Sequence, residues 1–265
     1  MKILITGAHG FVGNRLMQDL DDTVAAPSMR GMSEEQIRNM IEKSRADVII
    51  HTAAISDVGT CEKDPGASYE ANVRLPLFLA KAAKEQKLIC FSSDQVYRGC
   101  AGEGPYKEED ASPCNVYGRH KLEMEQKVLD VKPDAVMLRA EGMYDYPTKR
   151  SNYLRMLLNE KQVLTFGKQY RGITYLREVA ENMPKIFMLP GGVYNFGSET
   201  KQTMYDITCE MLHFLKSDRK PEEVPPAHNL WMDCTKAKER GILFSDAKEG
   251  LKRCLKDYHL AKDRE

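Results

Sequence analysis

The sequence opens with a short apolar run that stops at a glycine-rich turn and continues in a helical pattern. Residues 2–6 read Lys-Ile-Leu-Ile-Thr, and glycines follow at every third position, at Gly7, Gly10 and Gly13. A strand, a tight glycine turn and a helix place backbone N–H groups and a helix N-terminus where they can bind a pyrophosphate. An ordinary glycine turn is the alternative, because this spacing is less specific than G-x-G-x-x-G.

Length and charge restrict the class of protein. A chain of 265 residues can form one large core, or an α/β core with a smaller lobe. Lysine and arginine total 39, as do aspartate and glutamate, so the chain lacks the basic surplus typical of proteins that bind nucleic acid or acidic membranes. We therefore expect neither nucleic acid nor a membrane as a partner.

The compartment is inferred from the cysteines and the first strand. The seven cysteines are dispersed and never spaced as C-x-x-C, which favours free thiols over disulfides or zinc and predicts no metal site. No apolar run approaches the roughly 18 residues of a membrane span, and a strand that starts at residue 2 leaves no room for a signal peptide. These features predict a cytoplasmic protein.

Strands alternate with helices along the first half of the chain. Apolar runs predict strands at 2–6, 23–26, 47–51, 88–91 and 135–138. Periodicity and capping residues predict helices at 11–20, from 34, at 66–87 with a kink at Pro76, and at 115–129. This alternation predicts an α/β fold of Rossmann type, with a doubly wound parallel sheet. The loops after the strands then share one edge, where ligands bind.

The alternation is less regular beyond residue 140. We expect helices at 152–158, 176–187, 203–215 and 247–258, and strands at 162–166 and 193–196. Three prolines, Pro221, Pro225 and Pro226, mark a surface loop. The sequence predicts a Rossmann core over residues 1–139 and a smaller C-terminal lobe over 140–265. We expect the lobe to interleave with the last strands of the sheet in a single compact unit.

Three residues suggest proton-transfer chemistry. Tyr117 and Lys121 form Y-x-x-x-K in a predicted helix, so their side chains lie on one face. An ammonium group near a phenol lowers the phenol's pKa and lets it exchange a proton with a carbonyl or alcohol near neutral pH. Ser93 follows a predicted strand and could hydrogen-bond the same substrate oxygen. An ordinary pair on a helix surface and a strand-end cap are the alternative interpretations.

These motifs together resemble the extended short-chain dehydrogenase/reductases. The matching segments are Thr6–Gly13, Thr52–Ala54, Asn72, Ser92–Asp94 and Tyr117–Lys121. Other segments are similar to the dTDP-4-dehydrorhamnose reductases within that superfamily, namely Phe91–Tyr97, Tyr106–Asp110, Pro113–Glu123 and Thr174–Tyr175. The likeness is nearly continuous from Met1 to about Leu138 and returns at 192–199.

The resemblance implies an NAD(P)H-dependent reductase that delivers hydride to C4 of a nucleotide-linked 4-keto-6-deoxy sugar. Tyr117 would donate the proton, and Lys121 would hold the nicotinamide ribose and lower the pKa of the phenol. Ser93 would hydrogen-bond the carbonyl. Asn72 would support the helix that carries Tyr117 and Lys121. The implied partners are a nucleotide-sugar substrate and a second copy of the chain, as a possible homodimer.

The resemblance also implies which residues surround the ligands. The C-terminal lobe would bind the substrate, whose sugar would contact Ser93, Asp94 and Gly142, the last standing where the family has a substrate-contacting tryptophan. The cofactor-binding residues would be Gly7, His9, Gly10, Phe11, Val12, Gly13, Ser28, Arg30, Ala53, Ala54, Ile55, Phe91, Tyr117 and Lys121.

The loop after the second strand bears on the choice of cofactor. An NAD site uses an acidic residue there to bind the ribose 2′-hydroxyl, but this loop carries Ser28 and Arg30, and Gly31 stands where the family has an aspartate for adenine. A hydroxyl and a guanidinium suit a 2′-phosphate, so the sequence favours NADP(H), with NAD(H) possible. Alternatively, Arg30 only covers the adenine ring.

Three other functions use related residues. A sugar-nucleotide dehydratase needs an acid after the serine–aspartate pair, and the neutral amide of Gln95 at that position disfavours it. A nucleotide-sugar epimerase uses the same Ser, Tyr and Lys with a cofactor that it retains. A non-catalytic dinucleotide-binding regulator, as in the beta subunit of methionine adenosyltransferase, is the alternative from another class.

Overall fold

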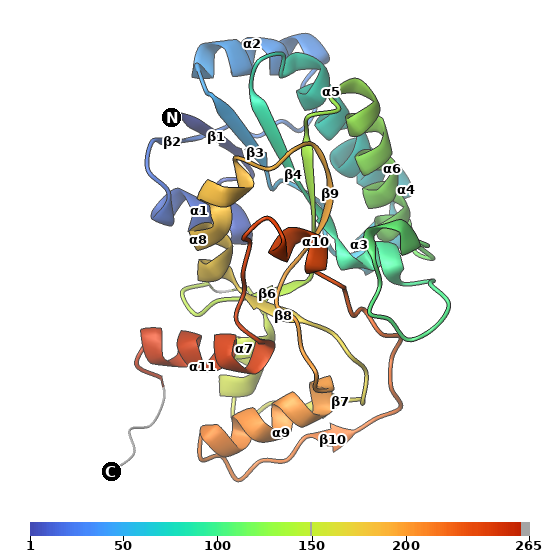
Figure 1. Cartoon of the computed structure of the whole chain (residues 1–265), viewed down its shortest axis with the longest axis vertical. Coiled ribbons are helices and arrows are strands. Elements are labelled where there is room, and N and C mark those ends of the chain that lie inside the picture. Colours follow the sequence, from blue (N-terminus) through green and yellow to red (C-terminus); the bar gives the residue numbers. More distant parts are fainter. Residues whose placement is uncertain (149, 261–265) are drawn as a thin grey trace.

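The computed structural model describes residues 1–148 and 150–260. Within them, a six-stranded parallel sheet has the order β2-β1-β3-β4-β5-β9 (Figure 1). The strands are β1 Ile3–Thr6, β2 Thr23–Ala25, β3 Val48–His51, β4 Lys87–Ser93, β5 Val136–Ala140 and β9 Gly192–Phe196. The order changes direction at β1, between β2 and β3, which makes this the point of a doubly wound sheet where ligands bind. The predicted Rossmann-type α/β fold is confirmed.

Helices cover both faces of the sheet. α1 (Phe11–Asp19) and α8 (Leu176–Ile186) pack with Ile3 and Ile5 on one face. On the other face, Leu4 and its neighbours pack with α2 (Glu34–Ser44), α5 (Leu75–Ala82) and α6 (Val116–Val131). Because successive residues of a strand point to opposite faces and both faces are buried, the strands are continuous apolar runs in the sequence.

The segment between β3 and β4 is more divided than the sequence predicts. In place of one helix over 66–87, it contains α3 (Val58–Lys63), α4 (Pro65–Tyr69), a π-helical turn η1 (Glu70–Arg74) and α5. Asp64 caps α4 by accepting from the Ala67 N–H. Pro76 lies in the first turn of α5, directly after the π-helical turn. Proline has no N–H to donate, and the first turn of a helix tolerates this. The chain therefore changes its hydrogen-bonding pattern at this proline.

The part of the chain after β5 returns to the central sheet once, through α8 and β9, and otherwise packs beside it (Figure 1). Its short strands pair as β6 (Gly142–Tyr144) with β8 (Ile173–Tyr175), and β7 (Thr165–Phe166) with β10 (Glu222–Glu223). Its helices are α7 (Tyr153–Leu158), α9 (Met204–Phe214), α10 (Thr235–Lys238) and α11 (Ala247–Asp257). The sequence did not predict α3, β6, β8, β10 or α10, which are too short for a clear period. The division at residue 139 stays a prediction.

The segment 99–113, which the sequence predicts as loop, is anchored at its centre. It contains a 3₁₀ turn, η3 (Glu108–Asp110), while η2 (Asp94–Tyr97) precedes it. Tyr106 forms a β-bridge with Met232, far along the chain. Among the described residues, none of the helices is long and apolar enough to cross a membrane.

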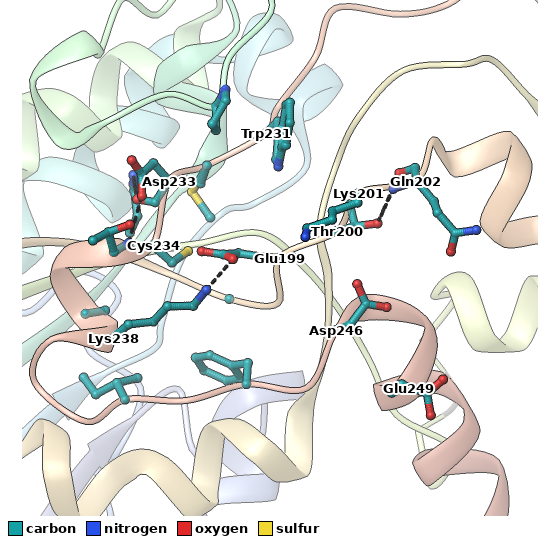
Figure 2. A pocket seen from close by; sticks show the side chains of 18 of the residues that line it. Glu199, Thr200, Lys201, Gln202, Trp231, Asp233, Cys234, Lys238, Asp246 and Glu249 are labelled. Atoms are coloured by element: carbon teal, nitrogen blue, oxygen red, sulfur yellow. Dashed lines mark hydrogen bonds and ion pairs between the residues drawn. The ribbon is translucent and has the colours of Figure 1, made fainter.

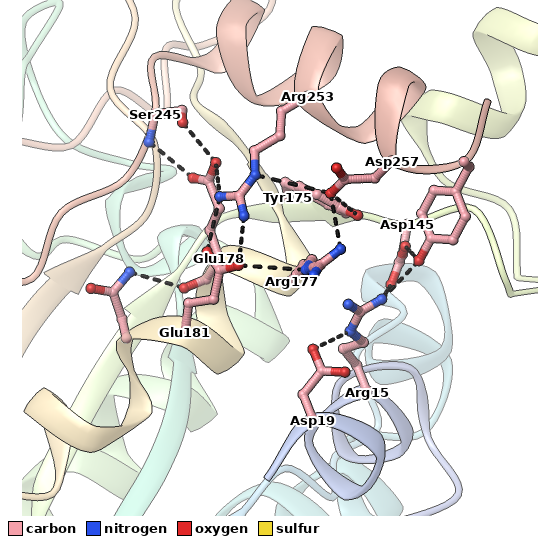
Figure 3. Close-up of polar contacts among 12 residues, drawn as sticks. Arg15, Asp19, Asp145, Tyr175, Arg177, Glu178, Glu181, Ser245, Arg253 and Asp257 are labelled. Atoms are coloured by element: carbon pink, nitrogen blue, oxygen red, sulfur yellow. Dashed lines mark hydrogen bonds and ion pairs between the residues drawn. The ribbon is translucent and has the colours of Figure 1, made fainter. Parts of the chain in front are cut away.

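A polar cluster joins the first helix to the C-terminal part (Figure 3). Arg15 of α1 is buried and donates to Asp19, to Asp145 after β6, and to the Tyr258 hydroxyl after α11, at 2.7, 3.1 and 2.8 Å. Tyr258 in turn donates to Asp145 at 2.9 Å. Because Arg15 lies two residues beyond Gly13, this cluster fixes the C-terminal part against the helix that begins at the glycine turn.

We predict that Asp145→Ala lowers the free energy of unfolding by about 2–3 kcal/mol, because it removes one partner of a buried guanidinium and leaves Asp19. Denaturant unfolding measures this loss. The matched control is Glu181→Ala, since Glu181 pairs with Arg253 at the surface, and the loss there should stay below about 1 kcal/mol. Equal losses for the two variants would contradict the role given to Asp145.

Candidate active site

The glycine turn is shaped by close backbone contacts. Gly7 has a φ of +72°, and a Cβ on it would lie 2.7 Å from the backbone nitrogen of Ala53. A Cβ on Gly13 would lie 2.2 Å from the Gly7 carbonyl oxygen. Gly10 precedes α1 and, among the described residues, no side chain caps this helix. The turn therefore leaves backbone N–H groups and a helix N-terminus open to an anion, which fits a pyrophosphate.

The other predicted cofactor residues lie along the same edge of the sheet. Ser28 and Arg30 are exposed beyond β2, whose Ala25 pairs with Ile5 of β1. The remaining positions are His9, Phe11 and Val12 at the start of α1, Ala53, Ala54 and Ile55 after β3, and Phe91 within β4.

Asn72 holds the segment after β3 rather than α6. Its side chain accepts from the Ile55 N–H at 3.1 Å and donates to the Ile55 carbonyl at 2.9 Å. It also donates to Ser68, whose hydroxyl lies 2.8 Å from the His120 ring of α6. The predicted support of α6 is therefore indirect, because the fully buried amide of Asn72, which lies in the π-helical turn, is used to fix the Ile55 backbone.

Ser93, Tyr117 and Lys121 come together where β4 ends. Tyr117 and Lys121 are 7% and 2% exposed, so they are not an ordinary pair on a helix surface. Asn115 caps α6 and fixes its start two residues before Tyr117. The Lys121 ammonium donates to the Phe91 carbonyl at 2.7 Å and lies 5.8 Å from the centre of the Tyr117 ring. Ser93 accepts from the Gln95 N–H, so it also caps the strand end.

The pKa of Tyr117 differs from the prediction. We expected the Lys121 ammonium to lower it, but burial raises the pKa of the phenol above its usual value, and the hydrogen bond with Ser93 only partly opposes this. Burial lowers the pKa of Lys121 to about 8. The ammonium donates to a backbone carbonyl instead of the phenol, so desolvation dominates both groups.

A buried ion pair fixes α6 to the strands beside it. The Glu125 carboxylate, one turn after Lys121, accepts from the Arg139 guanidinium of β5 at 3.0 and 2.7 Å. It also accepts from the Ser92 hydroxyl at 2.5 Å. Arg139 further donates to Tyr97 at 2.7 Å. Because Ser92 adjoins Ser93, this cluster sets the position of α6 relative to the end of β4.

Arg171 is a site residue that sequence reasoning missed. Its guanidinium donates to the buried Asp94 carboxylate at 3.0 and 2.8 Å, and Asp94 also accepts from Ser93 at 3.1 Å. A Cβ on Gly142 would lie 3.7 Å from that guanidinium, which is van der Waals contact, so Gly142 lies directly beside Arg171. The side chain of Arg171 keeps 36% of its surface exposed. The sequence gives no signal for this pairing, because the two residues lie 77 positions apart.

Glu141 is a second residue that sequence reasoning missed. Its carboxyl accepts from the Thr174 hydroxyl at 2.5 Å and from the Ser198 N–H at 2.7 Å. Burial raises the pKa of Glu141 to about 8, and the nearby Asp94 adds to this. A Cβ on Gly197 would lie 2.5 Å from this carboxyl, so the group fills the space between the ends of β5 and β9.

A cavity of about 770 Å³ lies beside the end of β9 (Figure 2). Its lining includes Trp231, Asp233, Lys201 and Asp246. Lys238 and Glu199, which form an ion pair, also line it. Among the described residues that line it, none is a predicted catalytic residue. The residues expected to carry chemistry therefore face another part of the edge.

With this geometry established, comparison with known proteins identifies the family. The model described as RmlD substrate binding domain matches residues 1–260. The chain belongs to this family. The predicted resemblance to dTDP-4-dehydrorhamnose reductases, within the short-chain dehydrogenase/reductases, is confirmed.

Relatives of this RmlD family member include proteins with two different kinds of name, a reductase and a subunit of another enzyme. The dTDP-4-dehydrorhamnose reductase of Aggregatibacter actinomycetemcomitans is 28% identical, over 84% of this chain and 82% of that protein. The methionine adenosyltransferase 2 subunit beta of Danio rerio is 28% identical, over 78% of this chain and 72% of that protein. A crystal structure of a Bacillus anthracis dTDP-4-dehydrorhamnose reductase in complex with NADP has a TM-score of 0.86 at 21% identity, over 97% of this chain and 99% of that one.

We predict that Glu141→Gln reduces the pH dependence of stability in this RmlD family member. The raised pKa means that the folded protein holds a proton on Glu141 that the unfolded chain loses above its ordinary pKa. Wild-type stability should therefore fall as the pH rises to about 8. The variant should melt about 2–4 °C higher than wild type at pH 8.5, an effect of about 1 kcal/mol, and near wild type at pH 5.

Scanning calorimetry across this pH range measures the effect. The matched control is Glu199→Gln, an exposed carboxylate at the cavity wall. A melting difference for Glu141→Gln that does not change with pH would contradict a buried, protonated carboxyl.

Proposed function

We propose that this protein is an NADPH-dependent reductase of a nucleotide-linked 4-keto-6-deoxy sugar, similar to the dTDP-4-dehydrorhamnose reductases among its relatives. The observation that carries this proposal is the burial of Ser93, Tyr117 and Lys121 together, at the edge of the sheet that also carries the open glycine turn. A proton donor, a hydroxyl and a buried cation beside a dinucleotide site are what carbonyl reduction requires.

The raised pKa of Tyr117 supports the direction of reduction. Reduction of a ketone needs a proton for the developing alkoxide, and a buried phenol stays protonated at neutral pH. The Ser93 hydroxyl is close enough to lower the pKa of the phenol and can share the same substrate oxygen. Lys121 places a buried cation one helical turn from Tyr117, where it would hold the nicotinamide ribose of a bound cofactor.

The glycine turn, with the loops after β2 and β3, would hold the cofactor. When bound there, a reduced nicotinamide would supply the hydride. Gly7, Gly10 and Gly13 leave the turn open to the diphosphate, and Ile55 is fixed by Asn72 along the same edge. Arg30 is exposed beyond β2 and free of a competing carboxylate in its loop, which favours a 2′-phosphate.

The substrate would enter beside Asp94, Gly142 and Arg171. Asp94 is buried and tied to Ser93 and Arg171, so it can accept from a sugar hydroxyl only at a defined position. The partly exposed guanidinium of Arg171 offers a cation to the diphosphate of a nucleotide sugar. Arg171 lies beside Gly142, the position at which the family has a substrate-contacting tryptophan. This supports a sugar pocket that differs from the tryptophan-lined pocket of the family.

A regulatory subunit is the second candidate, because proteins named methionine adenosyltransferase 2 subunit beta are as similar to this chain as the reductases are. Such a protein would bind a dinucleotide without turnover. Presence or absence of turnover therefore separates the two functions.

We predict that Tyr117→Phe lowers the turnover of NADPH with dTDP-4-keto-6-deoxy sugars by about 10²–10⁴-fold, the usual contribution of a general acid. Absorbance of the reduced nicotinamide follows the reaction. The matched control is Tyr205→Phe on α9, which should react like wild type. If wild type shows no turnover above Tyr117→Phe across a panel of such sugars, the reductase proposal is wrong and a regulator is favoured.

We also predict that Arg30→Ala weakens the binding of NADPH by about tenfold and that of NADH by less than twofold, because only NADPH carries the 2′-phosphate. Isothermal titration calorimetry measures both dissociation constants. The matched control is Arg38→Ala, on the exposed surface of α2 with Glu34. Equally weaker binding of NADPH and NADH would contradict a contact with the 2′-phosphate and would instead indicate that Arg30 covers the adenine ring.

A further inference from the structure

The glycine turn contains no positively charged side chain, although it would bind a diphosphate. Residues 7–13 include no lysine or arginine, and the turn offers backbone N–H groups alone. A diphosphate carries two negative charges, and a guanidinium binds such a group through paired hydrogen bonds. A cation from another part of the chain would therefore complete the turn.

Arg150 reaches this turn from the C-terminal part of the chain. Its guanidinium lies 5.9 Å from the centre of the Phe11 ring, the first residue of α1 after Gly10. The same guanidinium donates to the Ser56 hydroxyl at 3.0 Å, one residue beyond Ile55. Arg150 thus lies between the two loops, after β1 and after β3, that would bind the cofactor. It is also close enough to lower the pKa of Tyr117.

The segment that carries Arg150 is fixed on both sides. Asp145 binds the buried Arg15 of α1. Asn152, which caps α7, donates to the carbonyls of Asp145 and Arg150 at 3.0 and 3.1 Å. Asp145 and Asn152 are therefore linked to the helix that begins at the glycine turn, while the exposed Arg150 side chain can change partners.

We propose that Arg150 is a binding residue for the diphosphate of the dinucleotide, exchanging the Ser56 hydroxyl for the phosphate oxygens when the cofactor binds. The inference rests on the proposed dinucleotide site and adds a residue to it. A nucleotide sugar also carries a diphosphate, but contact with Phe11 of the glycine turn and with the segment after β3 places Arg150 on the cofactor.

Binding of NADPH, NADH and ADP-ribose, measured by calorimetry without turnover, tests this proposal. Arg150→Ala should weaken all three by about tenfold, because all contain the diphosphate and the loss is that of a charge-assisted contact. Arg150→Lys should recover part of the affinity, since a lysine keeps the charge and loses the paired geometry. Arg30→Ala is the matched control, which should weaken NADPH alone.

Ser56→Ala should not weaken NADPH binding. Wild type must break the hydrogen bond between Ser56 and Arg150 when the cofactor binds, whereas the variant has no such bond to break. NADPH binding by Ser56→Ala should therefore be equal to that of wild type or a few-fold tighter. A tenfold weaker affinity in Ser56→Ala would mean that this pair orders the site itself, and would overturn the proposed exchange.

Three further outcomes separate the failure of this inference from the failure of the proposed function. Unchanged NADPH affinity in Arg150→Ala, with weaker binding of dTDP-glucose, would overturn the proposal and place the guanidinium on the substrate. Wild type that binds NADPH, with an Arg150→Ala variant that binds it equally, would overturn this inference and leave the proposed function intact. Wild type that binds no dinucleotide would overturn both.

Discussion

The pairing of Arg139 with Glu125 is the interaction on which the geometry of the candidate site depends. It joins α6, which carries Tyr117 and Lys121, to β5, and through Ser92 to the end of β4. Both charges are buried, so each hydrogen-bonding group needs a partner at a fixed position. Few arrangements of α6 against the sheet satisfy this requirement, and the observed one brings the phenol beside Ser93.

The same cluster extends to the segments that surround the site. Tyr97 accepts from Arg139 and donates to Asn195 of β9 at 2.6 Å. The Asn195 amide donates to the carbonyls of Tyr106 and Asp233. A loop after β4 and a distant segment near the C-terminus are thus fixed to the strand that completes the sheet. The parts of the chain that border the reaction edge share one buried polar network.

Desolvation affects the pKa values of Tyr117 and Lys121 more than any interaction between their side chains does. Lys121 has a backbone carbonyl as its direct partner, and burial lowers its pKa while raising that of Tyr117. A nearby ammonium lowers the pKa of a phenol only where its attraction for the phenolate exceeds the cost of removing that phenolate from water. In the folded chain, the Lys121 ammonium donates to the carbonyl of Phe91 instead of the phenol. The phenol therefore keeps its proton and is suited to act as an acid.

The Rossmann core could be predicted from the sequence, because hydrophobic period, capping residues and the glycine turn are local features. Continuous apolar runs gave the buried parallel strands, and Asn115 and Ser33 marked the starts of α6 and α2. It also placed Tyr117 and Lys121 on one helix face, since four residues make about one turn. The short strands and turns beyond residue 140 contain too few residues to show a hydrophobic period in the sequence.

Contacts between residues far apart in the sequence follow from the folded arrangement. Arg171 reaches Asp94, Arg150 reaches Ser56, and Arg15 reaches Asp145 across 77, 94 and 130 positions of sequence. Such contacts depend on how loops return to the sheet, which no local pattern records. Burial, and with it the pKa values of Tyr117 and Glu141, likewise follows from packing around each group rather than from its neighbours in the chain.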